Sequence, residues 1–179
     1  MDFTHIKIGL ALAMIAILLG GSMGLGFGCC EETFEDTFKE SAAAVLAEKY
    51  NGDQKKADKV TKKSWVYMKR AHLHSQTMGV ISIAFSLIAA GLMFPPKLQM
   101  GISILSGFGG LGYGLFWLFA GFLAPGMGST GAAKDAVGLL AQASAGSFYI
   151  AALALFGALG YRVFFLKMAG QKNPNSSNG

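Results

Sequence analysis

Two histidines separated by one residue, His72 and His74, are the side chains of this sequence best suited to chemistry. They lie in the segment RAHLHSQTM, residues 70–78, just before a long apolar run. Imidazole nitrogens and thioether sulfurs bind haem iron and copper, so we interpret His72, His74 and Met78 as a candidate site for haem b or copper, with a quinone site as an alternative. Residues two apart on a helix lie about 200° apart, so the two histidines are expected to point in different directions, whereas His74 and Met78 share a face.

The third histidine, His5, precedes the first apolar run and is expected on the opposite side of a membrane from the other two. A haem held by two histidines of one chain is therefore not expected. A haem bound by one histidine of this chain would take Met23, Met127 or a histidine of a partner chain as its second ligand. The alternative interpretation is that these histidines lie at the membrane surface and hydrogen-bond lipid headgroups or a neighbouring chain.

Other chemical classes find little support in the sequence. No Asp, Glu or Lys is expected deep in an apolar run, which argues against proton relays and coupled transport. Phosphate-binding loops and the usual metalloprotease and serine-hydrolase motifs are absent, so no enzymatic activity is predicted. The net charge of +5 is small and its basic residues are mixed with acids, which argues against nucleic acid as a partner. The adjacent Cys29 and Cys30 have neither disulfide nor metal-site spacing.

Four apolar runs are long enough to cross a bilayer, at about residues 8–28, 71–94, 98–123 and 136–166. About 20 helical residues span the hydrocarbon core of roughly 30 Å. Pro95 and Pro96 end the second run, so the second and third spans should form a hairpin with a very short turn. A glycine-rich loop is expected at 124–131. The predicted fold is an all-α, integral membrane four-helix bundle over residues 1–170, followed by a disordered tail at 171–179.

The segment between the first two spans, residues 29–70, holds eight of the ten acids and nine of the fifteen basic residues. Phe34 and Phe38 recur at helical spacing, which predicts an amphipathic helical hairpin with a turn at Asn51-Gly52. Its second helix should start near Asp53 and continue into the second span. Aromatic and basic residues then gather at the membrane surface, and we interpret them as a basic collar that faces the headgroups: Lys62, Lys63, Trp65, Tyr67, Lys69 and Arg70.

Small residues at intervals of three or four predict close helix packing, because lipid gives helices no hydrophobic drive to associate. The predicted packing positions are Gly20, Gly24 and Gly28 in the first span and Gly107, Gly110 and Gly114 in the third. Gly109 and Gly112 form a second small face on the third span, which favours a helix buried within a larger assembly. Gln76 and Gln142 are candidates for a hydrogen bond between the second and fourth spans.

These features favour a non-catalytic accessory or structural subunit of a larger membrane complex, with a respiratory complex as one candidate. The expected partners are the lipid bilayer and other membrane subunits or further copies of the chain. The alternatives are a haem- or metal-binding redox protein and a small oligomeric channel. Lys and Arg are nearly balanced between the two sides, but the terminal side has almost no acid, so we expect the termini at the cytoplasmic face of the cell membrane.

Overall fold

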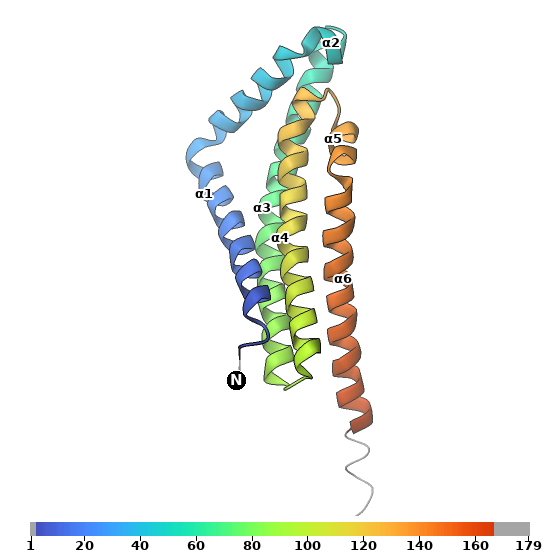
Figure 1. The fold of residues 1–179 in the computed structure, drawn as a ribbon. Coiled ribbons are helices and arrows are strands. Elements are labelled where there is room, and N and C mark those ends of the chain that lie inside the picture. The colour runs from blue at the N-terminus through green and yellow to red at the C-terminus, as the bar shows by residue number, and fades with distance from the viewer. Residues whose placement is uncertain (1–2, 167–179) are drawn as a thin grey trace, which may run out of the picture.

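Every regular element in residues 3–166, the part of the chain described in a computed structural model, is helical (Figure 1). The predicted tail at 171–179 lies outside this part. The elements are α1 (Lys7–Ala44), α2 (Leu46–Tyr50), α3 (Gln54–Gly91), α4 (Pro96–Gly126), α5 (Thr130–Ala136), α6 (Gly138–Tyr161) and a short π-helical turn, η1 (Arg162–Leu166). Within the described residues, α1, α3, α4 and α6 with η1 are long and apolar enough to cross a membrane. The prediction of an all-α four-helix membrane bundle is confirmed.

The helix α4 is the centre of this bundle. It packs against α1, α3 and α6, whereas α6 makes its main contacts with α4 alone (Figure 1). Of the most apolar 18-residue stretch of each helix, 56% of the residues are buried in α4 and only 17% in α6. The fourth span is therefore the outermost helix of the chain.

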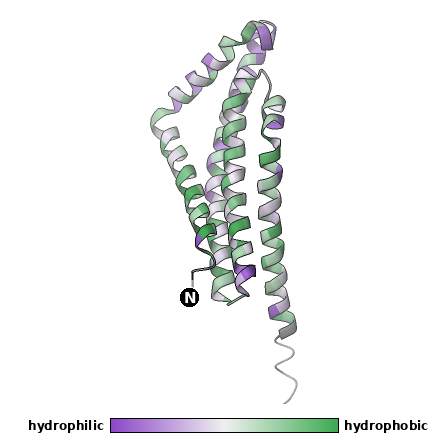
Figure 2. Ribbon diagram, viewed as in Figure 1, coloured by the Kyte–Doolittle hydropathy of each residue, from purple (hydrophilic) through white to green (hydrophobic). Residues whose placement is uncertain are grey.

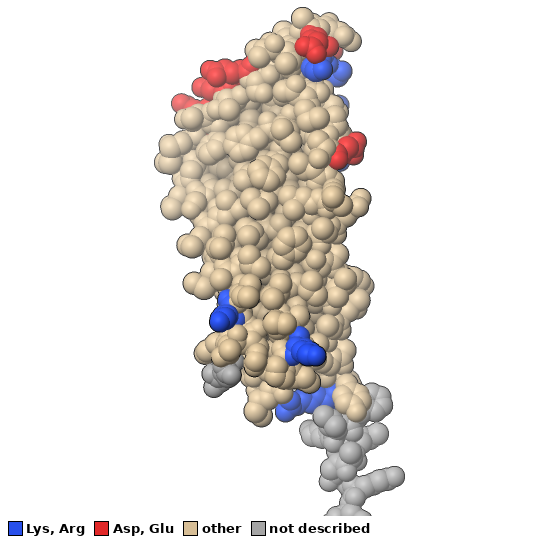
Figure 3. Space-filling view, in the orientation of Figure 1, with Lys and Arg blue, Asp and Glu red and all other residues tan. Residues whose placement is uncertain are grey.

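Near its middle, α1 bends at Cys30, whose backbone angles (φ −142°, ψ 31°) leave the helical region. The first helix of the predicted hairpin is thus continuous with the first span. Beyond the bend, α1 returns toward α3 and buries Phe38 and Ala42. This half of α1 is more hydrophilic than the half before the bend (Figure 2), and its acids lie on the outer surface (Figure 3). The aromatic rings of Phe27, Phe34 and Trp65 fill the space inside the bend, where the centroids of Phe27 and Trp65 lie 4.8 Å apart.

The third helix extends well beyond the bilayer. Its 38 residues are about 57 Å long, nearly twice the hydrocarbon thickness. From Arg70 to Leu92 the chain rises about 33 Å, which matches one crossing. As predicted, α3 starts after Asp53, whose side chain accepts a hydrogen bond from the backbone N–H of Lys56 at 3.0 Å. We call the end of the molecule that contains residues 31–70 and 118–137 the head.

Two predicted connections differ from the structure. The second span ends at Gly91, before the prolines, and Pro96 is the first residue of α4, where its missing N–H costs nothing. At the other end, α4 continues through Pro125 to Gly126, and α5 begins at Thr130, so most of the expected loop at 124–131 is helical. Pro125 lies in the last turn, where it removes a single helical hydrogen bond.

Buried serines join three helices near the terminal end of the bundle. Ser86 on α3 donates to Ser103 Oγ on α4 at 2.8 Å, and Ser103 donates to the carbonyl oxygen of Ile6 at 2.9 Å. Both serines are fully buried. The hydroxyls therefore connect the start of α1 to the α3–α4 pair.

Candidate functional site

His72 lies on the side of α3 that faces α1. Its Nδ1 is 2.7 Å from the carbonyl oxygen of Gly20. A carbonyl oxygen can only accept, so Nδ1 carries the hydrogen and Nε2 is the nitrogen left for a ligand. Gly24 makes room for the ring, because a Cβ there would come within 2.8 Å of Cε1 of His72. The sequence alone did not indicate this hydrogen bond, since it joins residues 52 positions apart.

His74 lies on the other side of α3 and faces α4. Its ring centroid is 5.0 Å from that of Tyr113 and 6.3 Å from that of Trp117, on which it stacks at 14°. The prediction that the two histidines point in different directions is therefore confirmed. Met78 packs against Gly110, where an added Cβ would lie 3.3 Å from the Met78 Cβ. His72 and His74 thus belong to separate helix interfaces.

The other predicted ligands lie elsewhere. Met23 is buried in a cluster with Phe38 and Met68, and Met127 packs against the head core around Tyr50. No group of three or more His, Cys, Asp and Glu residues in the described part of the chain could hold a metal ion. A metal or haem at His72 would therefore need ligands from methionine or from another molecule.

Five of the six predicted packing glycines lie against a neighbouring helix. A Cβ at Gly20 would come within 2.9 Å of the His72 carbonyl oxygen, and one at Gly107 would meet the backbone of Gly9. At Gly114 it would overlap Ser75 Oγ. Gly28 makes no such contact within the described chain, because a Cβ there would meet nothing within 4 Å, so a packing role for it against another subunit stays a prediction.

The second glycine face of α4 is occupied by α6 of the same chain. A Cβ at Gly109 would lie 2.8 Å from the Ser144 carbonyl oxygen, and one at Gly112 would lie 2.9 Å from the Ser144 Cβ. The α4 glycines at these contacts therefore cannot also line a channel between copies. The expected bond between Gln76 and Gln142 is wrong, because Gln76 lies against Gly20 on α1 whereas Gln142 is exposed on α6.

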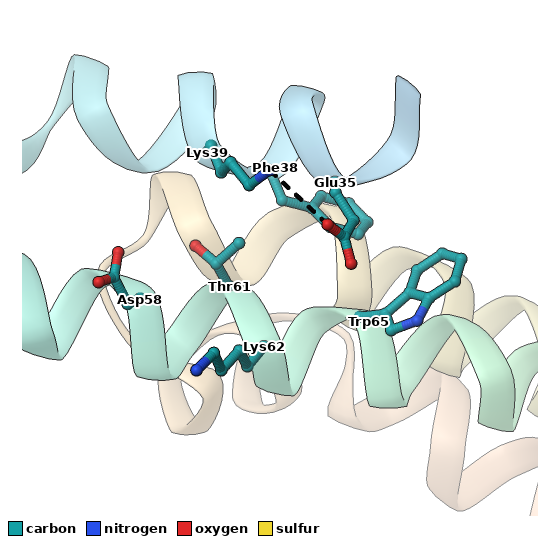
Figure 4. Close-up of a pocket in the computed structure, with 7 residues that line it drawn as sticks. All are labelled: Glu35, Phe38, Lys39, Asp58, Thr61, Lys62 and Trp65. Atoms are coloured by element: carbon teal, nitrogen blue, oxygen red, sulfur yellow. Dashed lines mark ion pairs between the residues drawn. The ribbon is translucent and has the colours of Figure 1, made fainter. Parts of the chain in front are cut away.

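A cleft of about 430 Å³ opens in the head between the outer half of α1 and α3 (Figure 4). Its lining residues are Glu35, Phe38, Lys39, Asp58, Thr61, Lys62 and Trp65. Lys39 pairs with Glu35 at 3.6 Å and with Asp36 at 3.1 Å, all on α1. Hydrogen bonding to Asp36 raises the pKa of Lys39. The ammonium group of Lys39 is thus paired with carboxylates of its own helix, while Asp58 and Lys62 line the cleft from α3.

The ends of the molecule differ in charge (Figure 3). Every described acid lies in residues 31–58 or at Asp135, in the head. At the opposite end the described charged residues are Lys7, Lys97 and Arg162, and Arg162 donates to the carbonyl oxygen of Leu92. The apolar surface between these ends is the part that lipid can cover.

Four apolar helices and glycine-mediated packing make this chain an α-helical membrane protein. No family model, curated protein or solved structure matches it. The basis for a function is therefore the geometry of the chain itself.

Proposed function

We propose that the protein is a non-catalytic subunit of a larger membrane assembly, and the open face of α6 is the observation that carries this proposal. A Cβ added at each of four α6 glycines would meet nothing within 4 Å: Gly138, Gly146, Gly157 and Gly160. The contact glycines of α4, in contrast, are filled by α1, α3 and α6. The glycine contacts inside the chain are thus filled, whereas the α6 glycines, with the exposed Ile150 and Leu153 beside them, have no partner in the described part of the chain.

Small residues on a membrane helix let another helix approach closely and gain van der Waals contact. Gln142 lies between Gly138 and Gly146 at spacings of four, so it shares their face, and it is exposed. An amide in contact with lipid lacks hydrogen-bond partners, which a neighbouring helix can supply. Both features support a partner helix on α6.

The test is the size and composition of the assembly purified in a mild detergent at native expression. We expect Gly146→Leu and Gly157→Leu to reduce the assembly, because the larger side chain separates the helices. Gly28→Leu is the matched control, since Gly28 is equally open but lies on α1. Mass spectrometry of the purified material distinguishes other subunits from further copies of the chain. A wild-type chain that is always monomeric, or an assembly unchanged by both α6 variants, contradicts the proposal.

A second candidate is a redox subunit that uses His72, and the Nδ1 hydrogen bond to Gly20 favours it. Histidines that bind metals commonly donate their other ring N–H to a backbone carbonyl, which orients Nε2 toward the metal. We expect His72→Ala to remove any haem or copper spectrum and His74→Ala to retain it. A colourless, metal-free protein from cells supplied with haem and copper would eliminate this candidate.

For orientation, we propose that the termini lie at the cytoplasmic face of the cell membrane. The support is the terminal end, whose described charges are all basic, as cytoplasmic loops favour. The head, with the acids, then lies outside the cytoplasm. Labelling of the exposed Cys29 and Cys30 from one side of the membrane tests this orientation.

A further inference from the structure

Arg70 lies where α3 leaves the membrane, and its surroundings differ from those of the neighbouring lysines. Its guanidinium carbon Cζ is 4.7 Å from the ring centroid of Trp117 on α4 and 5.7 Å from that of Tyr67. Lys69 instead lies over Trp65 at 5.6 Å, where Phe27 and Phe34 of α1 also pack. The uniform basic collar expected from the sequence is therefore divided, with Arg70 on the α4 side.

The cluster around Arg70 contains hydrogen-bond donors that have no acceptor. No carboxylate of the described residues forms an ion pair with Arg70. The indole Nε1–H of Trp117 also has no partner in the described part of the chain, but it is buried, so the exposed guanidinium of Arg70 is the donor that a ligand can reach. A ligand that suits this cluster carries negative charge and accepts hydrogen bonds.

Below Arg70, an exposed apolar stripe runs down α3 into the membrane. Val66, Leu73, Val80 and Leu87 recur every seven residues and are all exposed. Arg70 borders this stripe on the α4 side, between Val66 and Leu73, and Lys69 borders it on the α1 side. From Arg70 to Val80 the helix rises about 15 Å, half of the hydrocarbon core and thus the depth of one leaflet.

We propose that Arg70 binds the headgroup phosphate of an anionic phospholipid whose acyl chains lie along this stripe. The planar guanidinium can donate two parallel hydrogen bonds to phosphate oxygens. Trp117 and Tyr67 hold it in place through cation–π contacts, so it loses little freedom when the lipid binds. Arg70 has no paired carboxylate that could receive the ammonium group of a zwitterionic headgroup, which favours an anionic one. Free phosphate shares the headgroup chemistry but has no acyl chain for the stripe.

The proposal is tested by native mass spectrometry of the full chain in detergent, titrated with phosphatidylglycerol, phosphatidylcholine or inorganic phosphate. We expect phosphatidylglycerol to bind at least about tenfold more tightly than phosphatidylcholine. Arg70→Gln should lower the affinity for phosphatidylglycerol about tenfold or more. Arg70→Lys should retain only part of the wild-type affinity, because an ammonium group cannot donate two parallel hydrogen bonds as the planar guanidinium does. The matched control Lys69→Gln should lower this affinity by no more than about fivefold, because it removes only the general attraction of one cation to an anionic lipid surface.

A second readout uses Trp117 itself. The chain has two tryptophans, so Trp65→Phe leaves Trp117 as the only one, and its emission should change with phosphatidylglycerol but not with inorganic phosphate. An equal response to inorganic phosphate would show a free-anion site and overturn the lipid proposal. Equal losses of phosphatidylglycerol affinity in Arg70→Gln and Lys69→Gln would also overturn the proposal, because a basic collar without a specific site predicts the same loss at both positions. Both variants change exposed side chains, so we expect both proteins to fold and their lipid affinities to be comparable with that of the wild type.

Discussion

The hydroxyl of Tyr50 donates a hydrogen bond of 2.7 Å to the carbonyl oxygen of Pro125, which joins two segments 75 residues apart in the sequence. Pro125 lies in the last turn of α4, and its carbonyl oxygen also accepts from the backbone N–H of Gly128 at 3.3 Å. Tyr50 is 1% exposed and packs in the head core with Ala57 and Ala133. One buried phenol thus ties the turn between α1 and α3 to the end of the third span.

We expect Tyr50→Phe to lower the free energy of unfolding by about 1–3 kcal/mol, because it removes a buried hydrogen bond. Thermal unfolding of the purified chain in detergent measures this loss. Tyr149→Phe, on the exposed face of α6, is the control and should change little. Equal stability of wild type and Tyr50→Phe would show that the bond contributes nothing to the head.

The same bond predicts a pH dependence. Burial raises the pKa of Tyr50 above its usual value, whereas the unfolded phenol titrates near about 10. Its contribution is therefore complete below about pH 10 and is lost as the pH rises through the higher pKa of the folded state. We expect the stability difference between wild type and Tyr50→Phe to be constant from neutral pH to about 9 and to shrink above about 10. A constant difference up to about pH 12 would contradict this sign.

Alanine at Gly114 and at Gly101, both on α4, should have opposite effects. At Gly114 the new Cβ overlaps Ser75 Oγ and should destabilise the α3–α4 contact by about 1–3 kcal/mol. At Gly101 the new Cβ meets nothing within 4 Å, so the higher helical preference of alanine over glycine should stabilise the folded protein by up to about 1 kcal/mol. Unfolding in mixed detergent micelles measures both. A destabilisation of equal size at the two positions would show that Gly114 is packed no more tightly than Gly101.

The hydroxyls of Ser86 and Ser103 should be energetically coupled. Hydrogen bonds between membrane helices contribute about 0.6 kcal/mol on average, so a double-mutant cycle of Ser86→Ala and Ser103→Ala should give a coupling of this size. Ser147→Ala is the control, because its hydroxyl bonds only to Ala143 within α6. Strict additivity of the two buried changes would mean that their bond adds no stability.

Cys29 and Cys30 are the only thiols of the chain, and both are exposed at the bend of α1. If the termini are cytoplasmic, a membrane-impermeant maleimide should label intact cells. Labelling only after permeabilisation would reverse the orientation. Hydrogen bonding with Cys29 raises the pKa of Cys30, so its reactive thiolate is scarcer at neutral pH. Site-resolved mass spectrometry should therefore show Cys30 labelled more slowly than Cys29, with the difference closing as the pH rises.

The helices follow from local sequence because each signal acts over a few residues. Long apolar runs place the four spans, Asn51-Gly52 marks the turn in the head, and Asp53 caps α3. The spacing of His72 and His74 also predicts their divergence, since helical geometry alone decides it. Local signals were less reliable at the prolines. Pro96 starts a helix and Pro125 lies inside one, because the cost of a proline depends on the turn in which it falls.

The tertiary structure alone decides which faces meet. Gly28 and Gly24 belong to one sequence pattern, yet only Gly24 lies against His72, because α1 bends away from α3 at the membrane surface. The sequence likewise could not assign Gly109 to α6 or separate Arg70 from Lys69, since both depend on where α4 lies. By itself, the sequence determined a four-span helical membrane protein through hydrophobicity and helix period. The open face of α6 and the contact of Arg70 with Trp117 were decided by packing between residues far apart in the chain.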